Sequence, residues 1–125
     1  MRVRQSSKRG ANPPRSAPLR RLSSATVSEI VRRILQVSSP ERVFLFGSAA
    51  LGQMTRDSDI DLLVVERGVV DSRARSVAIG DSLRGIGFPF DVIVITQQRF
   101  DETKDLVGSI AHPASVHGRV IYGSP

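Results

Sequence analysis

Apolar residues recur along the chain in two rhythms, one helical and one extended. Between positions 26 and 35 they are spaced three and four apart, which predicts an amphipathic helix. Thr26 and Glu29 stand in the positions of a capping box at the start of this helix, and Pro40 follows its end. Three short apolar runs predict strands, at residues 42–46, 60–65 and 90–95.

A second helix is expected between the second and third strands. Asp71 is its predicted N-cap, residues 72–86 are its body, and Gly87 follows its end. The pattern places four apolar residues on its buried side: Ala74, Val77, Ala78 and Ile86.

The C-terminal third predicts shorter elements. Thr96 is expected to cap a helix near residues 97–100, and residues 101–117 are expected to be helical in part, with an interruption at Pro113. Residues 119–122 are expected to form a closing strand. Helices and strands therefore alternate along the chain, and this order predicts an α+β (α/β-like) domain with a sheet backed by helices.

Charge divides the chain into two parts. Seven of the 18 basic residues fall within residues 1–21, where no acidic residue occurs, so the remainder carries 11 basic and 12 acidic residues. The first part also lacks apolar periodicity, so we expect a disordered basic tail at 1–22 and one domain at 23–125. Nucleic-acid binding through this tail is possible in principle, but the tail has no aromatic residue for base stacking, and we do not favour it.

Composition narrows the kinds of metal site. The chain has no Cys and only two His, so zinc and disulfide chemistry are disfavoured, and any metal should be a hard cation bound by oxygen. No apolar run approaches the length of a membrane span, and we expect a soluble, cytoplasmic protein.

Gly47 and Ser48 follow the first predicted strand directly. Backbone N–H groups at such a strand-to-helix junction can bind a phosphate, and glycine lets the phosphate approach closely. A Gly-Ser pair after a strand is more often a simple turn, so this feature alone is weak evidence.

Two carboxylates, Asp59 and Asp61, lie two residues apart at the mouth of the second strand. They should face the same side, where their mutual repulsion favours a bound cation. The alternative is that Asp59 belongs to a loop and Asp61 is solvated at a strand edge.

Asp91 opens the third strand as Asp61 opens the second. If the two strands are neighbours in the sheet, the three carboxylates converge. The alternative for Asp91 is an ion pair with one of the arginines.

Taken together, Gly47-Ser48, ten intervening residues, Asp59-x-Asp61 and a later strand-borne Asp91 resemble the active site of polymerase-β-like nucleotidyltransferases. The pattern most resembles the minimal nucleotidyltransferase (MNT) branch, whose bacterial members are often antitoxins paired with HEPN toxins. The resemblance implies a mixed sheet of about three to four strands backed by helices.

The resemblance also implies roles for individual residues. Gly47 and Ser48 would bind the phosphates of ATP, and Asp59, Asp61 and Asp91 would bind two Mg²⁺ ions and act in catalysis. The family usually has Arg where this chain has Leu51, so a cation near the phosphates is missing. Arg56, in the following loop, is a candidate to replace it as a phosphate-binding residue.

The implied function is transfer of AMP from ATP to a hydroxyl of a partner protein, as the antitoxin of a HEPN/MNT-type toxin–antitoxin pair. Two alternatives remain open. The first alternative is a catalytically weak antitoxin that acts by contact. The second is a nucleotidyltransferase that acts on RNA or on a small molecule.

Overall fold

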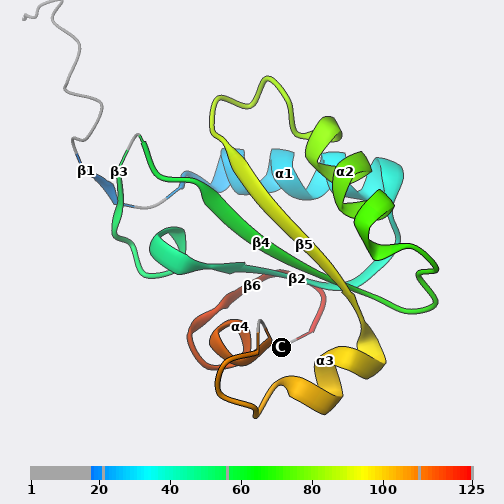
Figure 1. Cartoon of the computed structure of the whole chain (residues 1–125). Helices are drawn as coiled ribbons and strands as arrows, with labels where there is room; N and C mark the ends of the chain where they lie inside the picture. Colours follow the sequence, from blue (N-terminus) through cyan, green and yellow to red (C-terminus); the bar gives the residue numbers. More distant parts are fainter. Residues whose placement is uncertain (1–17, 21, 56, 110, 125) are drawn as a thin grey trace, which may run out of the picture.

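A four-stranded mixed sheet organises the protein (Figure 1). The computed structural model describes residues 18–20, 22–55, 57–109 and 111–124. The strands of the sheet are β2 (Pro40–Phe46), β4 (Ile60–Glu66), β5 (Phe90–Thr96) and β6 (Arg119–Tyr122), in the spatial order β5-β4-β2-β6. The central strands β4 and β2 are antiparallel, β4 and β5 are parallel, and β6 is antiparallel to β2. The predicted α+β fold and mixed sheet are therefore confirmed.

Two helices cover each face of the sheet (Figure 1). The helices are α1 (Ser24–Val37) and α2 (Ser72–Ser82) on one face, and α3 (Gln97–Thr103) and α4 (Ala111–His117) on the other. Alternate residues of β4 supply the two cores, since Leu62 packs with the α1/α2 core and Leu63 with the α3/α4 core. The strand β4 is therefore enclosed by two neighbouring strands and by both helical layers.

The strand-to-strand connection after β2 contains the glycine-serine pair. A single 3₁₀ turn, η1 (Gly47–Ala49), follows β2 directly. The chain then forms β3 (Met54–Thr55), which pairs with β1 (Pro18–Arg20) in a separate two-stranded ribbon.

This ribbon corrects the predicted boundary of the tail. Residues 18–20 form a strand, and Leu22 is buried in the α1/α2 core with 6% of its surface exposed. Within the predicted disordered tail at 1–22, residues 18–20 and Leu22 are therefore structured, because the apolar side chain of Leu22 joins this core. The prediction for residues 1–17 lies outside the described residues.

The first helix begins three residues earlier than the capping-box pattern predicts. The side chain of Ser23 is the N-cap and accepts a hydrogen bond from the Thr26 backbone N–H at 3.1 Å. Glu29 does not cap the helix but binds Arg32 and Arg33 instead. A serine three residues before Thr26 offers the same hydroxyl acceptor, so the helix gains most of another turn.

The second helix confirms its predicted cap but not its predicted face. Asp71 accepts from the Ala74 N–H at 3.0 Å, yet Ala74, Val77 and Ala78 are exposed. The buried residues are Ile79 and, just beyond the helix, Leu83, and of the predicted set only Ile86 packs against the same core, partly buried. The helix also ends at Ser82 rather than near 86, and Gly85 and Gly87 take positive φ in the turn that follows.

The C-terminal region contains the predicted helices with a different break. Thr96 caps α3 as predicted, accepting from the Arg99 N–H at 3.0 Å. Pro113 does not interrupt the last helix, because it lies in the first turn of α4, where no intrahelical N–H is required. The interruption falls instead between Thr103 and Ala111, and β6 forms where the closing strand is predicted.

A buried carboxylate joins the ends of three elements near the last residue of β4. Glu66 accepts a hydrogen bond from Ser38 Oγ at 2.7 Å and lies 3.6 Å from Arg75 Nη1. Arg75 also donates to the Val37 carbonyl at 2.8 Å. These contacts hold the C-terminal end of β4, whereas Asp61 lies near its N-terminal end. Among the described helices, none has the length and apolar character needed to cross a membrane.

Candidate active site

The sheet register brings two of the predicted metal ligands side by side. Asp61 of β4 pairs with Asp91 of β5, and Asp61 also faces Phe46 of β2 across the other strand boundary. Neighbouring strands lie about 4.8 Å apart, and paired residues of parallel strands project to the same face. Asp61 and Asp91 therefore carry their carboxylates on one face, at the start of both strands.

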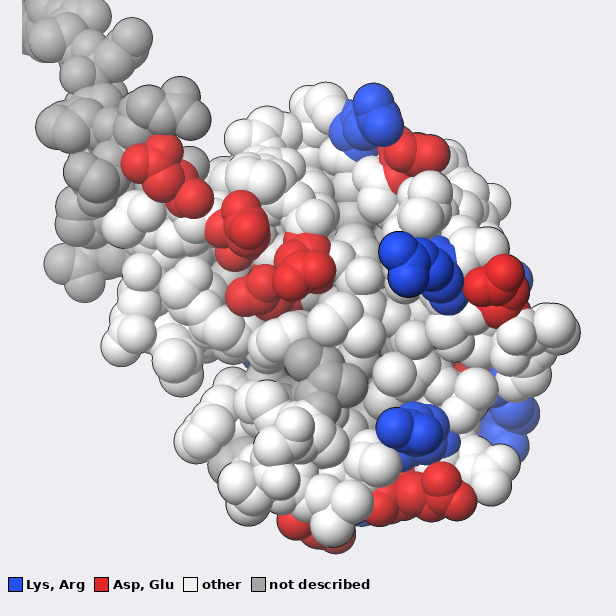
Figure 2. Space-filling view, in the orientation of Figure 1, with Lys and Arg blue, Asp and Glu red and all other residues white. Residues whose placement is uncertain are grey.

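That face is the one covered further along by α3 and α4. Leu63 and Ile93, two residues after Asp61 and Asp91, both belong to the core that includes Phe100 of α3 and Ala111 of α4. Side chains alternate along a strand, so residues two apart share a face. Neither carboxylate is buried, since Asp61 is half-buried and Asp91 is exposed. Figure 2 shows acidic side chains gathered over the starts of β4 and β5.

The pKa of Asp61 is affected by its burial and by the two other aspartates of the site. Partial burial raises the pKa of the Asp61 carboxyl, and the negative charges of Asp91 and then Asp59 raise it further. Asp59 is exposed in the connection just before β4. A cation placed among these groups would relieve the repulsion, so the charge distribution suits a positively charged ligand.

Gly47 lies directly against Asp61. Its φ is +68°, in the left-handed region, and a Cβ at this position would overlap Asp61 Oδ2. Two backbone hydrogen bonds close the turn that starts at Gly47. The Ala50 N–H donates to the Gly47 carbonyl at 3.2 Å, and the Gln53 N–H donates to the Ser48 carbonyl at 2.9 Å. Gly47 of the predicted phosphate-binding pair and Asp61 of the predicted carboxylates are therefore in contact, and a side chain at position 47 would displace one of them.

The residues fit a divalent ion in type and charge. Carboxylate oxygens are the ligands that Mg²⁺ takes in proteins, and the narrow gap at Gly47 keeps the backbone beside them. Within residues 18–20, 22–55, 57–109 and 111–124, no three His, Cys, Asp or Glu side chains already form a metal-binding group. The structure thus shows adjacent carboxylates without a preformed cage, and their assignment as ligands remains a prediction.

The family usually has an arginine where this chain has Leu51, and Arg56 is the predicted replacement for its positive charge. Leu51 is 55% exposed just after η1, so its side chain neither fills the core nor supplies charge. The prediction for Arg56 lies outside the described residues.

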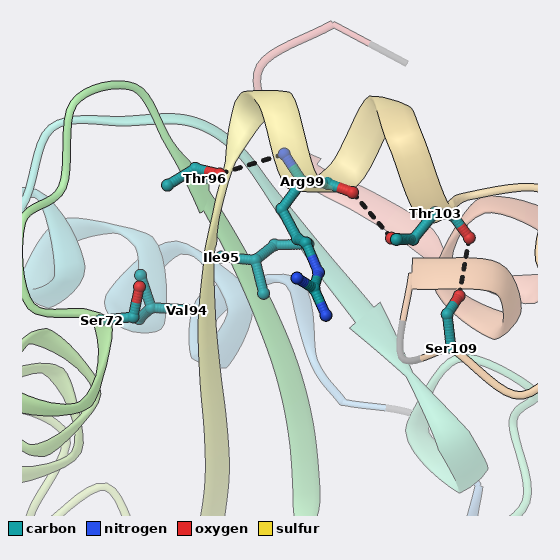
Figure 3. A pocket seen from close by; sticks show the side chains of 7 residues that line it. All are labelled: Ser72, Val94, Ile95, Thr96, Arg99, Thr103 and Ser109. Carbon is teal, nitrogen blue, oxygen red and sulfur yellow. Dashed lines mark hydrogen bonds between the residues drawn. The ribbon is translucent and has the colours of Figure 1, made fainter.

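Arg99 is not among the site residues predicted from the sequence. Its side chain lines a cavity of about 460 Å³ beside β5 and α3 (Figure 3). The available signal was an arginine in the first turn of a helix that directly follows the strand of Asp91, but the direction of its side chain depends on tertiary structure.

Three solved structures share the fold. A mutant of the toxin–antitoxin complex MntA–HpeT matches with a TM-score of 0.61 at 15% identity, covering 78% of this chain and 73% of that chain. A toxin–antitoxin structure with AMP-PNP matches with a TM-score of 0.61 at 18% identity and the same two coverages. A tri-AMPylated Shewanella oneidensis HEPN toxin in complex with MNT antitoxin matches with a TM-score of 0.57 at 14% identity, covering 80% and 71%.

Sequence comparison assigns the family. No curated protein matches the chain significantly. The model of the nucleotidyltransferase domain family matches residues 25–112, which include η1, both strands of the aspartate pair and α3. This match confirms the enzyme class predicted from the motif. The chain therefore belongs to the nucleotidyltransferase domain family.

Proposed function

We propose that this protein is a Mg²⁺-dependent nucleotidyltransferase that transfers AMP from ATP to a hydroxyl of a partner protein. The observation that carries the proposal is the arrangement of Gly47 against Asp61, with Asp91 paired to Asp61 in the sheet. A phosphate-binding turn and a carboxylate pair in contact are the two halves of a phosphoryl-transfer site.

Asp59, Asp61 and Asp91 would hold the metal ions, and Gly47 and Ser48 would bind the β- and γ-phosphates. When bound, the ions supply positive charge that neutralises the triphosphate and lowers the pKa of the attacking hydroxyl. In the reaction a bond forms from the acceptor oxygen to the α-phosphorus, the bond from that phosphorus to the β-phosphate oxygen breaks, and pyrophosphate leaves. Asp91 is exposed on the edge strand, so its carboxylate is placed to accept the proton of the incoming hydroxyl.

The nature of the nucleotide and acceptor is supported by the structural neighbours. One was solved with AMP-PNP and one contains a tri-AMPylated HEPN toxin with its MNT antitoxin. An ATP substrate and a HEPN-type protein acceptor therefore suit this chain. A toxin–antitoxin role follows, in which a tyrosine hydroxyl of the toxin receives AMP.

One observation favours a second candidate, an antitoxin that acts by contact alone. Leu51 occupies the position where the family usually has Arg, and it is exposed rather than packed. Loss of a cation near the triphosphate weakens stabilisation of the transition state, by on the order of 10²–10³ in rate for one such contact. In this reading the fold is retained for binding while the chemistry is slow.

The test is incubation with α-labelled ATP, Mg²⁺ and the product of the adjacent gene, followed by intact mass spectrometry. We expect a gain of one or more AMP units, a loss of on the order of 10²-fold or more in rate for Asp61→Asn, and a smaller loss for Arg56→Ala. Asp105→Asn is the matched control, because Asp105 is an exposed carboxylate beyond α3. Asp61→Asn should melt no lower than wild type, since it removes one of three mutually repelling charges.

The enzyme hypothesis would be contradicted if Asp61→Asn neutralised the partner as well as wild type does and the partner gained no mass. The protein would then be an antitoxin that acts by contact. A mass gain on RNA or on a small molecule instead of the partner would retain the enzyme and change its acceptor.

A further inference from the structure

A cavity of about 460 Å³ lies where β5 ends and α3 begins (Figure 3). Residues of β5 form part of its wall, and polar side chains of α3, of the loop after α3 and of the start of α2 form the rest. The lining residues used below are Ile95, Thr96, Arg99, Thr103 and Ser109. Of the described residues that line the cavity, only Arg99 carries a charge.

Three of the hydroxyl groups that line the cavity take part in hydrogen bonds within the protein. Thr96 Oγ1 accepts from the Arg99 N–H at 3.0 Å, and Thr103 Oγ1 donates to the Arg99 carbonyl at 2.7 Å. Ser109 Oγ donates to the Thr103 carbonyl at 2.7 Å. The backbone of Arg99 is therefore fixed on both sides, which positions its side chain at the cavity.

The Arg99 guanidinium itself has no hydrogen bond or ion pair with any residue that the structure describes, and the side chain is exposed. Figure 3 shows this side chain turned back from α3 along β5, beside Ile95. A fixed backbone with an unpaired guanidinium suits an external carboxylate, which arginine binds through two parallel N–H groups.

Arg99 shares a sheet face with the candidate active site. Asp91, Ile93 and Ile95 alternate along β5, and both isoleucines pack with the α3/α4 core. Asp91 and Ile95 are four residues apart, which is about 13 Å along a strand. A cation and the reactive carboxylates thus stand at the two ends of one half-buried apolar strip.

The position of β5 at the margin of the sheet makes one side of this strip accessible to a partner segment, although α3 and α4 cover part of its face. Among the strands of the described residues, β5 pairs with β4 alone and is an outer strand of its sheet. Ile93 and Ile95 are half-buried and so offer apolar surface beside the exposed Asp91. An extended chain of four or five residues reaches from Asp91 to the level of Ile95 and Arg99.

We propose that the strip from Asp91 to Arg99 is the acceptor-binding groove, in which an extended segment of the partner protein places a carboxylate on Arg99 and its acceptor hydroxyl beside Asp91. This inference rests on the proposed function for the role of the hydroxyl, and on Arg99 alone for the acidic character of the segment. Arg99 is then a residue that determines acceptor specificity without touching ATP.

The test uses fluorescein-labelled nine-residue peptides with the full chain. One pair carries Tyr with Glu four residues away, in either order, and a matching pair carries Gln in place of Glu. A fifth peptide has Glu next to Tyr, so that its charge is the same and its spacing differs. We expect the spaced Glu peptides to bind roughly threefold more tightly than the other peptides, since exposed ion pairs contribute factors of this size.

Variants assign this preference to one side chain. Arg99→Gln should remove it, Arg99→Lys should retain part of it, and Arg84→Gln should leave it intact because Arg84 is exposed beyond α2 and pairs with Asp81. Preference that persists in Arg99→Gln overturns the proposal, as does failure of wild type to bind or distinguish the peptides. A change in ATP affinity in Arg99→Gln also overturns it, because Arg99 would then belong to the nucleotide site.

The two proposals fail in different ways. An Arg99-dependent preference without AMP transfer to any hydroxyl retains the groove and removes the proposed reaction. AMP transfer to the partner with the same KM in wild type and Arg99→Gln retains the reaction and removes the groove.

Discussion

At the scale of single residues, Gly47 and Gly52 share a backbone conformation but differ in the space available for a side chain. Gly47 and Gly52 have nearly the same φ, +68° and +69°, so a side chain is strained at either position. A Cβ at Gly52 would meet nothing within 4 Å, whereas one at Gly47 would overlap Asp61 Oδ2. Any additional effect of substitution at Gly47 therefore comes from contact with Asp61.

This contrast gives a prediction for Gly47→Ala, with Gly52→Ala as the matched control. Gly52→Ala should lower the free energy of unfolding by about 1–2 kcal/mol through its left-handed backbone and leave Mn²⁺ binding unchanged. Gly47→Ala should lower it further and weaken Mn²⁺ binding, because Asp61 must move. Urea denaturation and isothermal titration with Mn²⁺ and a non-hydrolysable ATP analogue measure the two effects. Equal Mn²⁺ affinity in the two variants would show that Asp61 does not bind the ion.

The residues of the candidate site were predictable only in part. Gly47, Asp61 and Asp91 each adjoin an apolar run, so the strands that carry them could be recognised and their convergence expected. The parallel register of β4 and β5, which sets Asp61 opposite Asp91, depends on the whole sheet. The direction of the Arg99 side chain depends on how α3 packs, which no local pattern specifies.

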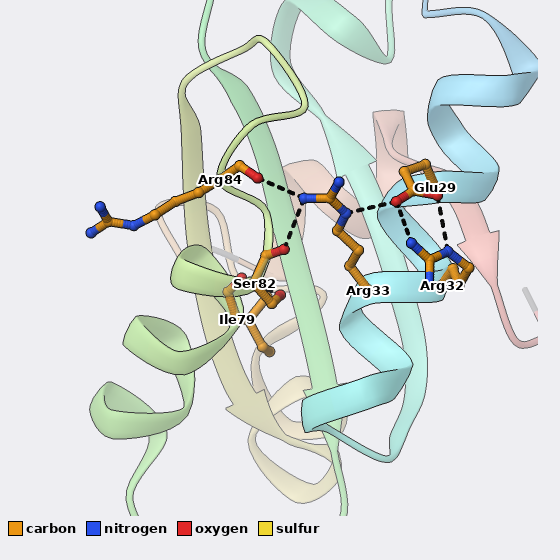
Figure 4. A network of polar contacts seen from close by, with 6 residues as sticks. All are labelled: Glu29, Arg32, Arg33, Ile79, Ser82 and Arg84. Atoms are coloured by element: carbon orange, nitrogen blue, oxygen red, sulfur yellow. Dashed lines mark hydrogen bonds and ion pairs between the residues drawn. The ribbon is translucent and has the colours of Figure 1, made fainter.

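At the scale of elements, a charged network joins α1 to the end of α2 (Figure 4). Glu29 accepts hydrogen bonds from Arg32 Nη2 at 2.6 Å and from Arg33 Nε at 2.7 Å. Arg33 also donates to the Arg84 carbonyl at 2.6 Å and to the Ser82 carbonyl at 3.3 Å. Glu29 therefore holds Arg33 in the position where it binds the turn after α2.

The pKa of Glu29 makes this network sensitive to acid. The hydrogen bonds from Arg32 and then Arg33 lower the pKa of Glu29 from 4.5 to about 2. A lowered pKa means that the ionised group stabilises the folded state above pH 4.5, and that this contribution is lost as the pH falls from 4.5 towards 2. Wild type should thus be more stable than Glu29→Gln at pH 7, and the difference should shrink across that interval.

Urea denaturation of both proteins at several pH values between 7 and 2 measures this difference. Glu102→Gln is the control, because Glu102 is exposed on α3 and accepts only from Gln98 among the hydrogen bonds of the described residues. A difference between wild type and Glu29→Gln that is the same at every pH would mean that Glu29 acts through its shape rather than its charge.

Elements were predictable where one rule decided them. The strands are continuous apolar runs, and the caps at Asp71 and Thr96 use side-chain oxygens that accept from the first turn. The face of α2 was not predictable from its sequence, because apolar residues lie on more than one side. Packing against β5 selects Ile79 and leaves Val77 60% exposed.

At the scale of the whole molecule, charge and core define different boundaries for the N-terminal region. Counting charge, the basic stretch runs to Arg21, and the rest of the chain is nearly neutral. By burial and strand pairing, the domain begins before Arg21, since residues 18–20 pair with β3 and Leu22 lies in the core. Composition reveals the first boundary, whereas the second depends on a pairing between segments more than thirty residues apart.

Two deletions distinguish these boundaries. Removal of residues 1–17 should leave the free energy of unfolding and nucleotide binding unchanged, because every described contact of β1 and Leu22 remains. Removal of residues 1–22 deletes β1 and the buried Leu22 as well, which should cost about 2 kcal/mol or more, as expected for emptying a leucine-sized space in a core. Urea denaturation of both truncated proteins and of Leu22→Ala gives the comparison. Equal stability of the two truncated proteins would place the start of the domain after Leu22, whereas a loss on removing residues 1–17 would show that the basic stretch itself packs on the domain.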